Sequence, residues 1–257
     1  MLTSIISGCT LNNVEEDAAP APIFKQHNLK GSFAMLDNIH EVFTVYNLKS
    51  YRDSAVAPGS SFQVLSTLLG IETGRYLNEK ALVHYQAGDS AAVISLKDGF
   101  EQGNAAAMAA VAERIGADTL QMWIDSLHYG KKVAVSQDSA GYIWNNGRLA
   151  ITPDEQLGFI GQLYFVKLPF QKRTQQIMRK LMIREDNTQY TLAYKAGWDH
   201  LTDGTYTGWV VGWVEENKHV YFFVLNAQPE NGTPTEGSLV AATKEVLKHY
   251  GFFEGKK

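Results

Sequence analysis

The 257-residue chain has a single cysteine, Cys9, and this scarcity excludes an internal disulfide framework. No run of 18 apolar residues occurs, so the sequence predicts no membrane-spanning helix. The seven histidines are scattered along the chain, and His40-Glu41 lacks the second histidine that a zinc-protease helix places four residues later. We therefore predict no metal site from the sequence.

Phosphate-binding signatures are missing as well. No Gly-x-Gly-x-x-Gly follows a strand pattern and no Gly-x-x-x-x-Gly-Lys occurs, so the sequence predicts no nucleotide cradle and no cofactor. The 23 basic residues are dispersed among 27 acidic ones, and the net charge of -4 argues against a nucleic-acid partner. What is present is 45% hydrophobic and 11% aromatic content, which is enough for one large core.

The residues around Cys9 match a bacterial lipid-attachment signal. Ile6-Ser7-Gly8-Cys9 has the small residues of a lipobox, in which the cysteine sulfur is diacylated, but residues 1–8 contain no Lys or Arg and are too short for an export signal. The alternatives are a lipoprotein with a truncated start and a chance Gly-Cys pair in a floppy terminus, and we favour the first. It predicts that residues 1–22 are a signal remnant and flexible linker, that lipid at Cys9 is the only membrane attachment, and that the protein lies on the periplasmic side of the bacterial envelope.

The hydrophobic periodicity changes twice along the chain. Apolar and polar residues alternate over 31–37 and 41–47, which predicts a hairpin, and over 190–197, 207–215 and 219–226, which predicts three more strands. Helical periodicity fills the interval between them, and a last helix is expected near the C-terminus. We therefore predict an α+β fold in which residues 23–257 form one domain, with a central antiparallel sheet built from N- and C-terminal segments, flanking helices, and a helical insertion over about 60–185. The predicted helices span 60–72, 105–115, 118–127, 153–165, 171–182 and 236–250.

Several short motifs occur in a fixed order. Residues 57–63 read Ala-Pro-Gly-Ser-Ser-Phe-Gln, and ordered anchors follow them. Together they resemble the class D (oxacillinase-type) serine β-lactamases, which have a penicillin-binding transpeptidase-like fold, and the resemblance extends from about Phe24 to Phe253. The anchors are Ile115-Gly116, Tyr129-Gly130, Trp144-Asn-Asn-Gly147, Lys195-Ala-Gly197, Gly208-Trp-Val-Val-Gly-Trp-Val-Glu215 and Thr243-Lys-Glu-Val-Leu247.

The resemblance implies a serine nucleophile at Ser60 and a problem at Gln63. Active members have a lysine three residues after the serine, and this lysine, carboxylated by carbon dioxide, is the general base for acylation and deacylation. Gln63 stands in its place. A carboxamide neither takes a proton near neutral pH nor adds carbon dioxide, and general acid-base catalysis contributes about 10² to 10⁴ in rate. Ser60 has the alternative interpretation of a helix N-cap.

The second and third motifs also depart from the family pattern. The serine of Ser-x-Val falls at Gly103, which has no hydroxyl. The Lys-Thr-Gly motif keeps Lys195 and Gly197 but has Ala196 for threonine, which removes a hydrogen bond to a substrate carboxylate worth ~0.5 to 1.5 kcal/mol. The resemblance thus makes Ala196 and Gly197 candidate substrate-binding residues.

Two further positions complete the substrate-binding candidates. The arginine that pairs with the substrate carboxylate in many members falls near Leu239. Trp144 corresponds to the tryptophan that packs over the modified lysine, and the alternative for it is an ordinary core aromatic.

Three functions compete on these observations. The first is a pseudoenzyme that binds or senses a β-lactam or peptidoglycan-like small molecule in the envelope. The second is a weak β-lactamase, or a slow covalent penicillin binder acylated at Ser60. The third is a different hydrolase chemistry with a base from Asp199, His200 or Asp203, for which solvation of a loop is the favoured alternative.

Overall fold

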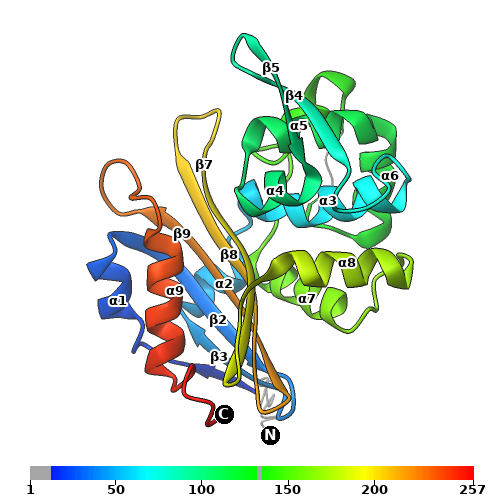
Figure 1. Cartoon of the computed structure of the whole chain (residues 1–257). Coiled ribbons are helices and arrows are strands. Elements are labelled where there is room, and N and C mark those ends of the chain that lie inside the picture. The colour runs from blue at the N-terminus through cyan, green and yellow to red at the C-terminus, as the bar shows by residue number, and fades with distance from the viewer. Residues whose placement is uncertain (1–12, 132–134) are drawn as a thin grey trace, which may run out of the picture.

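A seven-stranded sheet joins the two ends of the chain in the computed structural model, which describes residues 13–131 and 135–257. Its strand order is β1-β3-β2-β9-β8-β7-β6, and all neighbours are antiparallel except β1 and β3 (Figure 1). The predicted α+β fold with a central antiparallel sheet is therefore confirmed. The strands are β1 (Val14–Glu16), β2 (Leu29–Asp37), β3 (Val42–Tyr46), β6 (Ile183–Asp186), β7 (Tyr190–His200), β8 (Tyr206–Glu216) and β9 (His219–Pro229).

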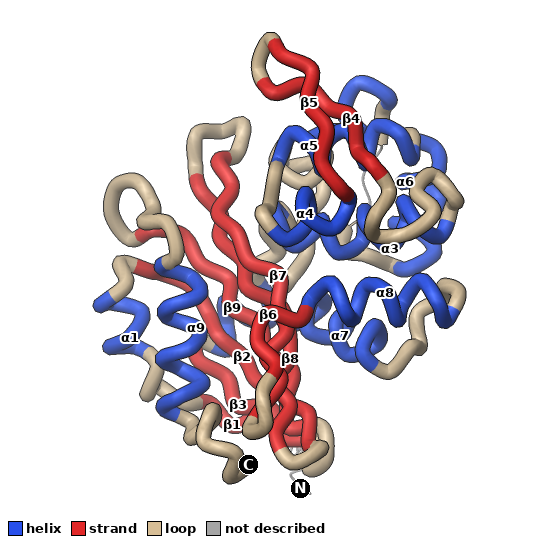
Figure 2. The backbone as a smooth tube through the Cα atoms, in the orientation of Figure 1, coloured by secondary structure: helices blue, strands red, loops and turns tan. Residues whose placement is uncertain are grey.

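Both faces of the sheet are covered by helices. Successive residues along a strand point to opposite faces, so each strand contributes side chains to two hydrophobic cores. On β8, Trp209 and Val211 belong to the core under the helical region, whereas Val210 and Val214 belong to the core on the opposite face. Two helices cover that opposite face, α1 (Ala21–Gln26) and α9 (Ser238–His249), as Figure 2 shows.

The helical region packs on the other face of the sheet. The five helices predicted between the strands are present, with ends that differ from the prediction by at most two residues. The hairpin of β4 (Leu82–Ala87) and β5 (Ser90–Ser95) was not predicted. None of the helices described is long and apolar enough to cross a membrane. The region comprises α2 (Leu48–Asp53), η1 (Gly59–Ser61), α3 (Phe62–Glu72), α4 (Leu96–Glu101), α5 (Ala105–Ile115), α6 (Ala117–Leu127), η2 (Gln137–Tyr142), α7 (Pro153–Tyr164) and α8 (Lys172–Met182).

The predicted N-terminal linker needs a correction within the described residues. Residues 13–22 were expected to form a flexible linker, but Val14–Glu16 pairs in parallel with β3. The Phe43 N–H donates to the Asn13 carbonyl at 2.8 Å, and the Asp17 N–H donates to the Val45 carbonyl at 2.8 Å. Residues 13–22 are therefore part of the folded domain and not of a flexible linker. Cys9 and its predicted lipid lie outside the described residues.

Candidate active site

Ser60 lies in the 3₁₀ turn η1, at the point where the chain enters α3 beside the sheet. Gly59 allows the turn because its φ is +49°, a left-handed value that favours glycine. The Ser60 hydroxyl does not cap the helix, so the N-cap interpretation is wrong. It points instead toward β7 and donates a hydrogen bond to the Asp199 carboxylate.

Asp199 contacts Ser60 twice through one oxygen. Its Oδ2 accepts from the Ser60 hydroxyl at 2.8 Å and from the Ser60 backbone N–H at 2.5 Å. Asp199 belongs to β7, so the expectation of a solvated loop is wrong for this residue. His200, at the exposed end of β7, packs its ring against Tyr206 instead, and Asp203 accepts from Thr205 in the following turn.

Asp199 has two opposite effects on Ser60: its carboxylate is a proton acceptor for the hydroxyl, and it also occupies the backbone N–H. Burial raises the pKa of its carboxyl, against the opposing effects of the Ser60 hydrogen bonds and the charge of Lys195. A carboxylate that is hydrogen-bonded to a serine hydroxyl is a weak proton acceptor. The same oxygen occupies the backbone N–H of the nucleophile, which in serine acyl-transfer enzymes is a usual donor to the developing oxyanion.

Lys195 lies on the same strand, with its amine buried behind the cleft. The side chain is 1% exposed, and Nζ donates to the Phe100 carbonyl at 2.7 Å. Burial lowers the pKa of Lys195 to about 7; Arg184 acts in the same direction, and Asp199 opposes it. The amine can therefore be neutral near physiological pH.

Gly103 and Lys195 come together as the second and third motifs predict. A Cβ built at Gly103 would lie 3.5 Å from the Lys195 amine. Any side chain there would be strained, because φ is +66° at this position. The backbone conformation at position 103 therefore suits glycine, the residue that lacks the serine hydroxyl of the second motif.

Gln63 is buried in α3, and its carboxamide is not a base near neutral pH. The residue is 1% exposed, and Oε1 has no hydrogen-bond partner among the described residues. A buried polar atom without a partner destabilises a fold by about 1 to 3 kcal/mol. Position 63 thus holds a buried polar group that supplies no proton acceptor.

A cleft of about 410 Å³ opens over Ser60. It gathers five of the predicted site residues, and other lining residues, such as Gln102 and Glu236, were not predicted from the sequence. Gly197 is packed so closely that a Cβ there would lie 2.5 Å from the Ser60 hydroxyl. The lining residues are Ser60, Gln102, Gly103, Ala196, Gly197, Trp198, Pro234, Glu236, Gly237, Leu239 and Val240.

Trp144 is placed behind this cleft rather than on its wall. It is 3% exposed and stacks on Phe62 with ring centroids 5.9 Å apart. Its position matches the alternative of a core aromatic, so we withdraw Trp144 as a substrate-binding candidate. Trp198 does line the cleft, and its Nε1 donates to the Ser238 hydroxyl at 3.2 Å.

The charges around the cleft offer little attraction to the carboxylate of a ligand. Leu239 presents an apolar surface where many relatives have an arginine, and Glu236 adds an exposed carboxylate to the rim. Lys195 supplies the cationic group of the third motif, but from a buried position. Carboxylate recognition is therefore weakened by charge as well as by the loss of the threonine hydroxyl.

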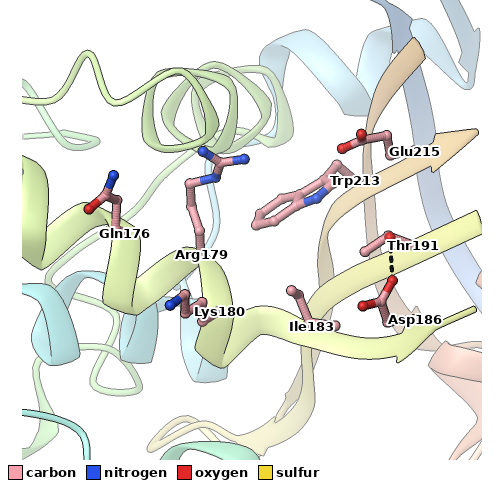
Figure 3. A pocket seen from close by; sticks show the side chains of 8 residues that line it. All are labelled: Gln176, Arg179, Lys180, Ile183, Asp186, Thr191, Trp213 and Glu215. Carbon is pink, nitrogen blue, oxygen red and sulfur yellow. Dashed lines mark hydrogen bonds between the residues drawn. The ribbon is translucent and has the colours of Figure 1, made fainter. Parts of the chain in front are cut away.

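A second cavity, of about 450 Å³, lies between α8 and strands β6 to β8 (Figure 3). Arg179 on its helix wall lies over the Tyr164 ring at 4.4 Å, and the Tyr164 hydroxyl donates to Glu215 at 2.7 Å. On the strand wall, the Thr191 hydroxyl donates to Asp186 at 2.8 Å. The first two contacts join α8 to β8 through Tyr164 of α7, and the third joins β7 to β6. None of the residues that line the Ser60 cleft takes part in them.

Comparison with known proteins agrees with this geometry. Residues 22–248 match the penicillin binding protein transpeptidase domain family. The chain is 30% identical to the probable β-lactamase YbxI of Bacillus subtilis over 86% of this chain and 81% of that protein. The class D β-lactamase FUS-1 (OXA-85) of Fusobacterium nucleatum superposes with a TM-score of 0.83 at 25% identity, covering 95% of this chain and 100% of that one.

A third likeness concerns the fold alone. The C-terminal domain of the Bacillus licheniformis BlaR penicillin-receptor has a TM-score of 0.83 at 22% identity and covers 94% of this chain and 98% of that one. The matched length, the shared sheet and the ordered motifs agree with one another. This chain belongs to the penicillin-binding protein transpeptidase domain family, as a homologue of the class D β-lactamases.

Proposed function

We propose that this chain is a pseudoenzyme of the class D group, which binds a β-lactam or peptidoglycan-like small molecule in the Ser60 cleft without ordinary turnover. The observation that carries the proposal is the double contact of Asp199 Oδ2 with the hydroxyl and the backbone N–H of Ser60. The proposal places the protein in the bacterial envelope as a binding or sensing protein. That part is supported only by the lipobox-like sequence before Cys9.

Two losses at Ser60 support the absence of turnover. The lysine base is replaced by Gln63, and general-base catalysis contributes about 10² to 10⁴ in rate. The backbone donor of Ser60 is engaged by a carboxylate, and loss of one oxyanion donor reduces kcat by about 10² to 10³. Multiplied together, the two losses lower the rate by about 10⁴ to 10⁷, which brings an enzyme with an ordinary kcat of about 1 to 10³ per second down to about 0.1 per second or less.

The fold alone does not choose between an enzyme and a receptor. Among proteins of this fold are a probable β-lactamase in Bacillus subtilis and a penicillin receptor in Bacillus licheniformis. Function therefore has to be inferred from the residues of the cleft rather than from the architecture.

The test is turnover of a chromogenic cephalosporin by the purified chain. We expect no hydrolysis above buffer, because neither Gln63 nor the engaged Ser60 amide supports acylation. Binding is measured separately, by calorimetric titration of a penicillin into the Ser60→Ala variant, in which no covalent step can occur. Turnover at typical enzyme rates of about 1 to 10³ per second would refute the pseudoenzyme.

A second candidate is a slow covalent penicillin binder, and the 2.8 Å contact between the Ser60 hydroxyl and Asp199 favours it. If Asp199 acts as a weak base, long incubation with a penicillin adds the mass of the drug to the chain, and Ser60→Ala abolishes the adduct. Intact mass spectrometry measures this.

Asp199→Asn separates the two roles of the carboxylate. The acylation rate falls if Asp199 is the base, and it stays the same or rises if Asp199 only blocks Ser60. Absence of any adduct at high drug concentration refutes this second candidate.

A further inference from the structure

Three donor side chains meet at the end of the sheet away from Ser60. Asp37 is the last residue of β2, His40 lies in the turn to β3, and His219 is the first residue of β9. The antiparallel register pairs Asp37 with Tyr221, two residues from His219. The Ser60 cleft lies beside Gly197, which is level with Asn226, so the two places are roughly 20 Å apart along β9.

The donor atoms converge. Asp37 Oδ1 lies 2.7 Å from His219 Nε2, and Asp37 Oδ2 lies 2.9 Å from His40 Nδ1. One ligand atom from each residue lies within 4.8 Å of those of the other two. The side chains of His219 and Asp37 are 13% and 20% exposed, whereas that of His40 is 68% exposed. Two donors are thus fixed in the fold, and the third faces solvent, from which an ion can enter.

We propose that Asp37, His40 and His219 bind a divalent transition metal, with Zn²⁺ the ion that the donor set fits best. Two imidazole nitrogens and one carboxylate are three of the four ligands of a tetrahedral zinc site, and water completes it. The ion would take the place of the protons that the carboxylate and the rings share. Each ring would coordinate through a nitrogen that carries no proton, and the carboxylate offsets part of the cation's charge.

Tyr221 gives His219 the outer contact that such ligands use. Its hydroxyl lies 3.0 Å from His219 Nδ1, and the two rings stack with centroids 4.1 Å apart. When the hydroxyl accepts from Nδ1–H, the lone pair of Nε2 faces Asp37 and the ion. Tyr221 therefore holds the ring in place, and its hydroxyl is able to accept from the tautomer that coordinates a metal through Nε2.

The competing interpretation is a hydrogen-bonded turn without a metal. Asp37 Oδ1 also accepts from the backbone N–H groups of Ile39 and His40, at 3.0 and 3.1 Å. Asp37→Asn retains an oxygen that can accept both of these bonds but removes the negative charge. This variant therefore distinguishes the metal site from the turn.

The experiment is calorimetric titration of Zn²⁺ into the full chain with Cys9→Ser, which removes the chain's single thiol. We expect one Zn²⁺ per chain and a rise in Tm on binding. Saturable binding should disappear in Asp37→Asn and in His219→Gln, and it should weaken ~10- to 100-fold in Tyr221→Phe. His249→Gln, an exposed histidine on α9, is the matched control and should bind as the parent does.

Two results would overturn the site. One is no saturable binding to the parent chain. The other is unchanged binding in Asp37→Asn and His219→Gln, with circular dichroism showing that both are folded. The assay contains no β-lactam, so its outcome is independent of the function proposed for the Ser60 cleft.

Discussion

The variant Gln63→Lys, Gly103→Ser, Ala196→Thr is expected to acylate Ser60 only slowly, and adding Asp199→Ala is expected to raise the rate ~10²- to 10³-fold further. A lysine at position 63 supplies the missing base. Oδ2 of Asp199 nevertheless continues to occupy the Ser60 N–H, so the oxyanion lacks this donor until the carboxylate is removed. Gln63→Lys alone is expected to give little.

Backbone geometry limits the recovery as well. A serine at position 103 brings its hydroxyl near the Lys195 amine. The left-handed φ of +66°, however, makes the folded protein with serine about 1 to 2 kcal/mol less stable than the protein with glycine. We therefore expect the variant with all four substitutions to acylate more slowly than an active class D enzyme.

The measurement is the rate constant of adduct formation with a penicillin, followed by quenched intact mass spectrometry. Asp203→Ala is the matched control for Asp199→Ala, because Asp203 is an exposed aspartate close in sequence that bonds Thr205 and not Ser60. Ordinary turnover by Gln63→Lys alone would show that the other departures matter little. A slower rate after Asp199→Ala would show that Asp199 is the working base.

Lys195→Met is expected to increase the free energy of unfolding at pH 7, and the increase is expected to shrink as the pH rises toward 10. In the folded chain the pKa of Lys195 is about 7, whereas the group has its ordinary value of 10.5 when unfolded. Between these values the unfolded chain binds one more proton, so wild-type stability rises with pH over this window. Methionine cannot titrate and lacks this dependence.

The lowering of the Lys195 pKa from 10.5 to about 7 corresponds to an effect on the order of 4 kcal/mol across the window. Urea unfolding of both proteins at several pH values between 7 and 10 measures it. Lys80→Met, at an exposed lysine, is the control and should show no pH-dependent difference from wild type. A constant difference between wild type and Lys195→Met would mean that the amine stays charged in the fold.

The sequence predicted the sheet well because its strands carry strong patterns. Strands β7, β8 and β9 have aromatic and β-branched residues that alternate between two cores, and this signal survives without knowledge of the partners. The β4–β5 hairpin has a weak pattern because most of its residues are exposed on both faces. Strand β1 was missed because a three-residue segment carries almost no periodicity.

The site was predicted in composition but not in its central contact. Ser60, Gly103, Ala196, Gly197 and Leu239 line one cleft, as the motif order indicated. The pairing of Asp199 with Ser60 depends on how η1 docks against β7, and spacing along the chain contains no information on it.

One signal for Asp199 was nevertheless available. Lys195, Gly197 and Asp199 are two residues apart in succession, and on a strand such residues share one face. Because Gly197 packs against Ser60, its neighbours on that face also point toward the site. The Asp37 cluster gave no comparable signal, because it joins residues from opposite ends of the sequence.

The adjacency of β2 and β9 in the sheet also sets an order for biosynthesis. Strand β2 ends at Asp37, and its neighbour begins at His219, so about 180 residues leave the ribosome before the pair can form. At ~5 to 20 residues per second this takes roughly 9 to 36 s. Throughout that interval Phe33 and the open edge of β2 lack their partner, while the residues of the helices from Phe62 to Met182 are being synthesised. The segment of the nascent chain that is most exposed to aggregation is therefore β2, and this exposure ends when β9 leaves the ribosome and pairs with it.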